Sequence, residues 1–163
     1  MGSQLNSDGL FVKIGTTKAT ATKAGEYRTV GALREIEVTL SDLTTLTNTA
    51  AIIADVTFFP KMRIEEVEVV NTTAATSGGS ATLDLGLIQT DRSTEIDFEA
   101  FLNGAALADY NAVGEKIIYR IGTSGVGQLV GTTTTNVGYI TANFNTAAFT
   151  AGALKIIIRY RSV

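Results

Sequence analysis

The sequence predicts an all-β protein: an antiparallel β-sandwich of about eight strands, jelly-roll-like in strand order, with an extended N-terminal arm. Threonine, which fits the half-buried surface of a strand, occurs 25 times in 163 residues. Sixteen glycines against one proline are typical of strands joined by many turns. Several segments alternate apolar and polar residues at the two-residue period of a strand. Long predicted loops alternate with short ones, which favours a jelly roll over a simple meander.

The composition excludes several classes of function. The chain has no histidine and no cysteine, so histidine-based catalysis, thiol catalysis and the usual zinc sites are excluded. Its first residues lack the basic segment and apolar run of a secretory signal, and no stretch approaches the roughly 18 apolar residues of a membrane helix. We therefore expect one domain that is not an enzyme, with no cofactor, no metal and no membrane partner.

Residues 1–33 are predicted to form the arm, and residues 34–163 the sandwich body. Thr16–Gly25 is a low-complexity segment that cannot pack a core by itself, so the arm would gain order only by lying on another surface. The apolar patch at Leu10–Ile14 would anchor it there. The alternative for Leu10–Ile14 is a first strand within the sheet of the body.

The arm is basic and the body is acidic. Residues 1–34 carry five basic and two acidic side chains, whereas the rest of the chain carries 8 basic and 14 acidic ones. This pattern is typical of a segment that lies on an acidic protein surface, although an ordinary solvated tail is the alternative. The charges are sparse and no aromatic ladder accompanies them, so nucleic acid is not an expected partner. The predicted partner-binding residues are Leu10, Phe11, Val12, Lys13, Ile14, Lys18, Lys23 and Arg28.

The body begins with two predicted strands. Arg34–Leu40 alternates cleanly, with its apolar residues facing inward. Residues 41–48 are polar and threonine-rich and would form one helical turn or a loop. Ala51–Phe59 is predicted to be the second strand, and Pro60 ends it because proline lacks the backbone donor of a strand ladder.

Met62–Gln89 is predicted to be a central hairpin of strand, loop and strand. The apolar phase of the first strand slips by one between Glu65 and Glu66, which indicates a β-bulge. The predicted loop is Asn71–Ser80, where a pair of glycines supplies the freedom that a turn needs. Three leucines are expected on one face of the second strand: Leu83, Leu85 and Leu87.

The second half of the chain repeats this design. Glu95–Phe101 alternates as a strand would, but together with residues 102–107 it could equally be a short helix. The other predicted elements are strands at Lys116–Ile121, Tyr139–Phe144 and Ala153–Tyr160, a short edge element at Gln128–Val130, and a small-residue loop at Asn145–Gly152 that makes the last two strands a closing hairpin.

The last strand suggests oligomerisation. Ile156, Ile157 and Ile158 are consecutive, so the strand is apolar on both faces. Such a strand lies either at the centre of a sandwich or in a subunit interface.

Two other kinds of site have weaker support. Asp97 and Glu99 would share one strand face and could bind a hard cation with Asp84, although a solvated acidic face is the simpler interpretation. A sugar site would need exposed aromatic side chains. The residues considered for it are Tyr110, Tyr119 and Tyr139, for which edge or interface positions are the alternative.

Three stretches together resemble the capsid decoration (cement) proteins of tailed bacteriophages. They are ADVTFFPKMRIEEVEVVNTT, SATLDLGLI and the ending AGALKIIIRYRSV, in a threonine-, alanine- and glycine-rich chain without cysteine or histidine. The resemblance covers roughly residues 34–163. The segment 1–33 fits the habit of that family of carrying an extended N-terminal arm.

The resemblance implies a jelly-roll body that assembles as a homotrimer on the outer surface of a capsid, at local or icosahedral threefold positions. Such a protein would be made in the host cytoplasm. It would clamp adjacent major capsid proteins against the pressure of packaged DNA, with the major capsid protein as its partner. The alternative is a β-sandwich carbohydrate-binding or adhesin module, or a head fibre, that contacts its ligand through the loops at 71–80, 122–127 and 145–152.

Overall fold

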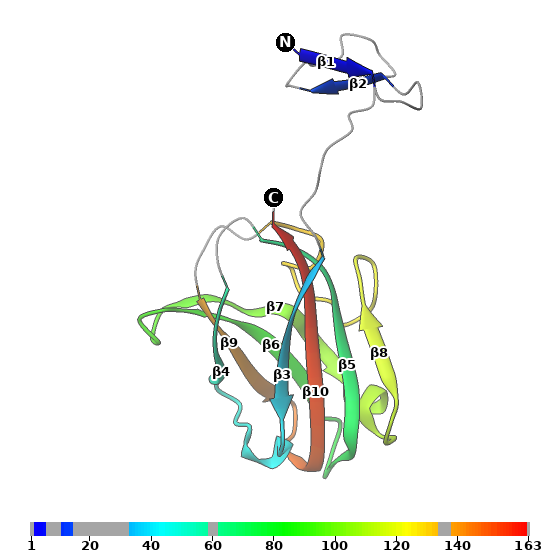
Figure 1. Ribbon diagram of the computed structural model, residues 1–163. Coiled ribbons are helices and arrows are strands. Elements are labelled where there is room, and N and C mark those ends of the chain that lie inside the picture. The colour runs from blue at the N-terminus through cyan, green and yellow to red at the C-terminus, as the bar shows by residue number, and fades with distance from the viewer. Residues whose placement is uncertain (1, 6–10, 15–32, 59–61, 134–137, 163) are drawn as a thin grey trace.

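The computed structural model describes residues 2–5, 11–14, 33–58, 62–133 and 138–162 (Figure 1). These residues form strands and two short 3-10 helices, η1 (Leu43–Thr45) and η2 (Leu107–Tyr110). The strands are β1 (Gly2–Leu5), β2 (Phe11–Ile14), β3 (Arg34–Leu40), β4 (Ala51–Phe58), β5 (Met62–Ser77), β6 (Thr82–Gln89), β7 (Glu95–Ala106), β8 (Lys116–Tyr119), β9 (Gly138–Asn145) and β10 (Phe149–Ser162).

The body is a jelly roll of two four-stranded sheets. One sheet has the order β3-β10-β5-β8 and the other the order β4-β9-β6-β7. The pairing is nested: β3 pairs with β10, β4 with β9, β5 with β8 and β6 with β7, all antiparallel. The chain therefore runs as one long double ribbon that is wrapped into two layers, and Figure 1 shows the first layer in front of the second. The predicted fold class and the number of body strands are confirmed.

The two predicted hairpins are wrong. β5 and β6 belong to opposite sheets, and so do β9 and β10, so each pair crosses from one layer to the other. The predicted loops at 71–80 and 145–152 are also too long, because residues 71–77 continue β5 and pair with the start of β10. These residues are mostly threonine and alanine, and threonine favours a strand. Alternation along a strand identifies its buried face but not the sheet to which it belongs.

The predicted bulge in β5 is confirmed. Arg159 of β10 pairs with Glu66 and the next residue, Tyr160, pairs with Ile64, so Glu65 is the extra residue. The bulge keeps Ile64 on the same inward face as Val67 and Val69, and all three side chains are completely buried.

Several other predictions have a clear outcome. Residues 95–106 form a strand, β7, so the helical alternative is wrong for them. Residues 41–48 contain one helical turn, η1, which begins where the Asp42 side chain accepts a hydrogen bond from the Thr44 backbone. Residues 128–130 form a turn, so the predicted edge element there is wrong.

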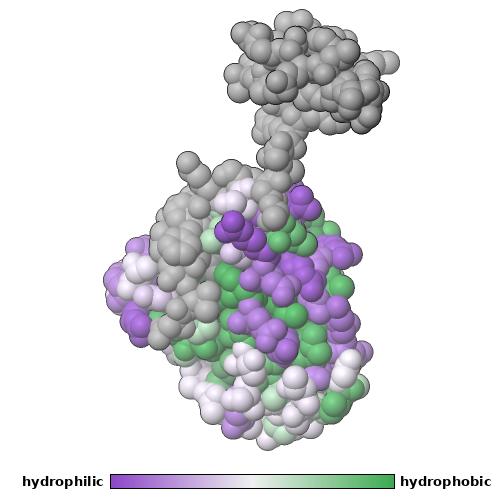
Figure 2. Space-filling model, viewed as in Figure 1, coloured by the Kyte–Doolittle hydropathy of each residue, from purple (hydrophilic) through white to green (hydrophobic). Residues whose placement is uncertain are grey.

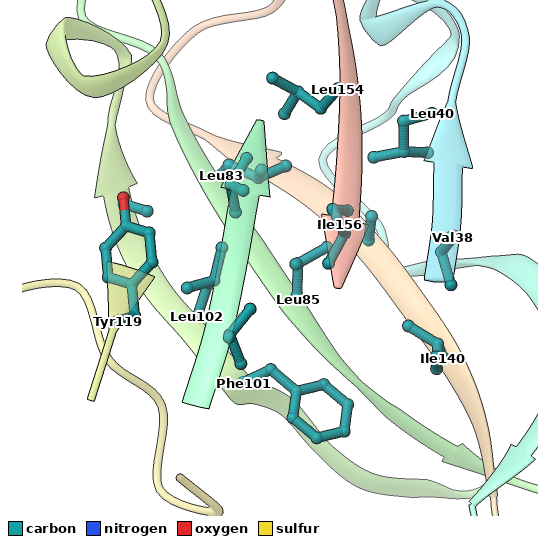
Figure 3. Close-up of a cluster of buried hydrophobic side chains, with 14 of the residues drawn as sticks. Val38, Leu40, Leu83, Leu85, Phe101, Leu102, Tyr119, Ile140, Leu154 and Ile156 are labelled. Carbon is teal, nitrogen blue, oxygen red and sulfur yellow. The ribbon is translucent and has the colours of Figure 1, made fainter. Parts of the chain in front are cut away.

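The core lies between the two sheets (Figure 3). The leucines at 83, 85 and 87 are at most 1% exposed and belong to this core. Figure 3 shows Leu83 and Leu85 on the side of Leu154 and Ile156 of the other sheet. β10 is an inner strand of its sheet, so the apolar run at 156–158 is explained by a central position in the sandwich. Ile156 and Ile158 point into the core and Ile157 lies on the partly exposed outer face.

The N-terminal segment contains a small hairpin. β1 pairs with β2 from Gly2 opposite Ile14 to Leu5 opposite Phe11, and neither strand pairs with a sheet of the body. The alternative in which residues 10–14 form a strand of the body sheet therefore does not hold for β2. Four of the predicted partner-binding residues, Leu10, Lys18, Lys23 and Arg28, lie outside the described residues. Within the described part of the chain, neither helix has the length or apolar character to cross a bilayer.

Candidate interaction surfaces

A lattice of paired charges covers the outer face of the sheet β3-β10-β5-β8. The paired charges mostly alternate in sign from strand to strand: β3 and β5 supply the glutamates, β10 and the β8 region supply lysines and arginines, and β5 adds Arg63. Figure 2 shows these hydrophilic side chains as a purple band over the middle of the face. We call this surface the charge lattice, and its members are Glu35, Glu37, Glu65, Glu66, Glu68, Arg63, Lys116, Arg120, Lys155, Arg159 and Arg161.

Arg159 is the centre of the lattice. Its guanidinium lies 2.5 Å from Glu66 Oε1, 2.6 Å from Glu68 Oε2 and 3.5 Å from Glu35 Oε2. Glu66 and Glu68 of β5 each have a second cation on the β8 side: Arg120 lies 2.7 Å from Glu66 Oε2, and Lys116 lies 2.7 Å from Glu68 Oε1. One continuous row of alternating charge therefore runs across the four strands.

The two inner glutamates are held ionised. Burial acts to raise the pKa of Glu66, but hydrogen bonds from Arg159 and Arg120 outweigh it and hold that pKa below its ordinary value. Burial likewise opposes ionisation of Glu68, and the pairs with Lys116 and Arg159 again lower its pKa. Because its charges are satisfied internally, the lattice stabilises the sheet and leaves little net field to attract a charged partner.

The four edge strands of the sandwich differ in how they are protected. Unpaired strand edges invite pairing with other chains, and proteins blunt them with charge, short length or a covering segment. β3 carries Arg34 and two glutamates, and β8 is only four residues long. β7 is covered, because residues 125–129 exchange backbone hydrogen bonds with residues 100–103.

In the part of the chain that the structure describes, β4 is the least protected of the four edges. It is eight residues long, its only charged residue is Asp55, and among the described residues it pairs with β9 alone. That pairing is itself loose, because two register shifts leave five aligned positions. Two shallow depressions, of about 230 and 300 Å³, lie along this strand and share Ile52 and Ile53 as lining residues. We call the strip formed by Ile52, Ile53 and Ala54, which line these depressions, the seam.

The proposed cation site is not assembled. β7 does lie beside β6, but the Asp84 carboxylate accepts hydrogen bonds from the Gly104 backbone and from the amides of Asn143 and Asn145. Asp97 Oδ1 instead accepts from the Glu99 backbone at 2.8 Å. In the described ranges no three acidic, histidine or cysteine side chains converge as a metal site would require.

The proposed aromatic sugar site is wrong for two of its three residues. Tyr110 and Tyr119 are 0% and 1% exposed, and their hydroxyl oxygens lie 2.7 Å apart. The Tyr119 hydroxyl also donates to Asp109 at 3.2 Å. Tyr139 is partly exposed, and the Arg92 guanidinium lies 5.0 Å from the centre of its ring. The chain therefore presents no cluster of exposed tyrosines at these positions.

Sequence reasoning missed both the charge lattice and the seam. The sequence did contain a signal for the lattice. Glu35 and Glu37 lie on the same face of one strand, and Lys155 and Arg159 lie on the same face of another. The pairing of β3 with β10, and of β10 with β5, was the missing information. The seam depends on which strands are edges, and that follows only from strand order.

Solved structures with a similar fold come from phage capsids. The chain matches one chain of the cyanophage Pam1 capsid asymmetric unit with a TM-score of 0.54 and 15% sequence identity, over 93% of this chain and 100% of that one. It matches a chain of the capsid of Ralstonia phage GP4 with a TM-score of 0.53 and 12% identity, over 85% and 90% of the two chains. At such identities the likeness shows a shared fold. No protein-family profile and no curated protein matches this chain.

Both matches cover most of this chain and most of the capsid chain to which it is aligned. Residues 33–163 are about 80% of the chain, so both alignments also reach into the first 32 residues. The Pam1 chain is matched along its entire length, so it is a chain of similar size rather than a larger protein that contains this fold as one part.

Proposed function

We propose that this protein is a structural component of a phage virion that binds the outer surface of the capsid and stabilises it by clamping adjacent major capsid proteins. The observation that carries the proposal is the match to chains of two phage capsids over nearly the full length of both partners. It agrees with the sequence resemblance to decoration proteins, which rests on the three stretches quoted in the sequence analysis.

The geometry supports a binding role. The described body has a dense core and a stable, charge-paired outer sheet, and its two depressions are shallow strips rather than enclosed pockets. A small substrate is normally held in a cleft that buries most of its surface. A capsid protein offers instead a broad surface, to which a rigid sandwich with an N-terminal arm can attach at two places.

The arm would provide part of the contact. Its predicted contact residues include the apolar β2 and the basic residues that follow it, and an acidic capsid exterior would attract them. A segment that orders on binding gives up affinity to the cost of ordering but can span the boundary between neighbouring subunits. Assembly as a homotrimer would add avidity without a tight single contact.

Co-sedimentation with capsids tests the proposal. Capsids of the phage that encodes this chain, prepared without it, would be mixed with the purified protein and pelleted. We expect saturable binding to intact capsids and a higher temperature of capsid disruption once the protein is bound. A protein that stays in the supernatant at all concentrations would contradict the proposal.

A further inference from the structure

The N-terminal hairpin of β1 and β2 has no further strand beside it, and the edge of β4 next to the seam has no strand paired with it among the described residues. β1 and β2 form a two-stranded sheet of four residues per strand, and such an isolated hairpin is at best marginally stable in water. β4 has an edge that no described strand occupies. Adding the hairpin to that edge would give the short sheet further strands and cover the apolar edge in one step.

We propose that the N-terminal hairpin of one copy adds to the free edge of β4 in a neighbouring copy and covers its seam. The occupant is a second copy because the single chain leaves both halves unfilled: the hairpin pairs with neither sheet of its own body. Eighteen residues, 15–32, connect β2 to the body, and an extended chain of that length spans at most about 60 Å.

The chemistry of the two surfaces agrees. β2 has the sequence Phe-Val-Lys-Ile, which offers apolar residues to a seam lined by isoleucines. The residues after β2 include Lys18, Lys23 and Arg28, and the exposed Asp42 lines the second of the two depressions. Arg92 lines one of the two depressions and would lie at the border of the contact.

This contact joins different surfaces of the two copies. Heterologous contacts of this kind close into a ring when the rotation between subunits allows it. Three copies would make a trimer in which each hairpin straps the next body. The inference concerns the free protein, so it can fail or hold independently of capsid binding.

Disulfide trapping provides a direct test, because the natural chain has no cysteine. A Val12→Cys/Ile52→Cys variant places one thiol in β2 and one in β4. We expect mild oxidation to produce covalent dimers and trimers that a reductant returns to single chains. The matched control is Val12→Cys/Val113→Cys, since Val113 is 68% exposed and lies away from the seam, and it should stay monomeric on the gel. A link formed only within one chain, or no link at all, would overturn the proposal.

Light scattering gives a test that does not depend on the register of the strands. We expect full-length protein and a Val113→Lys variant to be assembled, and Ile52→Lys to have the 17.2 kDa mass of a monomer with an unchanged circular dichroism spectrum. Ile52 is partly exposed and lies outside the hydrophobic core, so the substitution leaves the core intact. Monomeric wild-type protein, or an assembled Ile52→Lys variant, would contradict the inference.

Discussion

Arg159 Nη1 lies 2.6 Å from Glu68 Oε2, and the Glu68 side chain is only 4% exposed. A buried carboxylate is costly unless it is paired, and Arg159 also reaches Glu66, so one arginine compensates two inner charges of β5. This pairing joins β5 to β10, the strand pair with the most extensive register in the molecule. The charged side chains on the outer face of the sheet β3-β10-β5-β8 therefore contribute to the stability of that sheet.

Removing the central cation should destabilise the fold. We expect Arg159→Met to lower the free energy of unfolding by about 2 kcal/mol, because Glu68 keeps only Lys116 and Glu66 keeps only Arg120. Lys155→Met on the same strand is the matched control, since Lys155 pairs with the exposed Glu37 and such pairs contribute less than about 1 kcal/mol. Urea denaturation measures both values, and equal losses in the two variants would contradict the central role of Arg159.

The same pairs make stability depend on pH in a defined direction. The pKa values of Glu66 and Glu68 are lower in the folded protein than the ordinary value of 4.5 that applies when the chain is unfolded. Their contribution is therefore present above about pH 4.5 and is lost as the pH falls through the lowered values. Glu68→Gln should make the loss of stability below that pH shallower in urea denaturation series from pH 7 to pH 3. Parallel curves for the variant and the wild type would show that these pairs do not set the acid limit.

Gly86 should not tolerate a side chain. A Cβ at this position of β6 would overlap the backbone of Phe98, because β7 bulges over the strand between its pairings at Asp97 and Leu102. We expect Gly86→Ala to cost roughly 2–3 kcal/mol of unfolding free energy. Gly78→Ala is the control: no atom lies within 4 Å of its Cβ, so the change should be neutral or stabilise the protein by up to about 1 kcal/mol. A thermal melt distinguishes the two, and an unaffected Gly86→Ala protein would mean that β7 does not approach so closely.

The arm should be needed for binding to the capsid but not for folding of the body. We expect a variant that lacks residues 1–33 to keep the circular dichroism spectrum of a folded body and to lose binding to capsids. For the full-length protein, binding should weaken as salt is raised from 50 to 500 mM, because the contribution of the basic residues is screened. Co-sedimentation measures both effects. Full decoration by the shortened protein would contradict the role assigned to the arm.

The sequence alone predicted the elements better than their arrangement. The phase slip at Glu65 predicted the bulge because a change of alternation has one common structural cause. The same alternation could not show that β5 and β6 lie in opposite sheets, since a strand looks alike in either layer. The burial of Tyr110 was equally hidden, because its hydroxyl is satisfied by Tyr119, a residue from another element. The charge lattice and the seam both depend on strand order, which local patterns do not contain.

The central claim is that this protein decorates the outside of a capsid, and a cryo-electron microscopy map of capsids incubated with it tests that claim most directly. We predict added density on the outer surface at threefold positions, three jelly rolls to each position, with each copy touching more than one major capsid protein. Capsids whose surface is unchanged at saturating protein, or density found only on the tail or inside the shell, would contradict it.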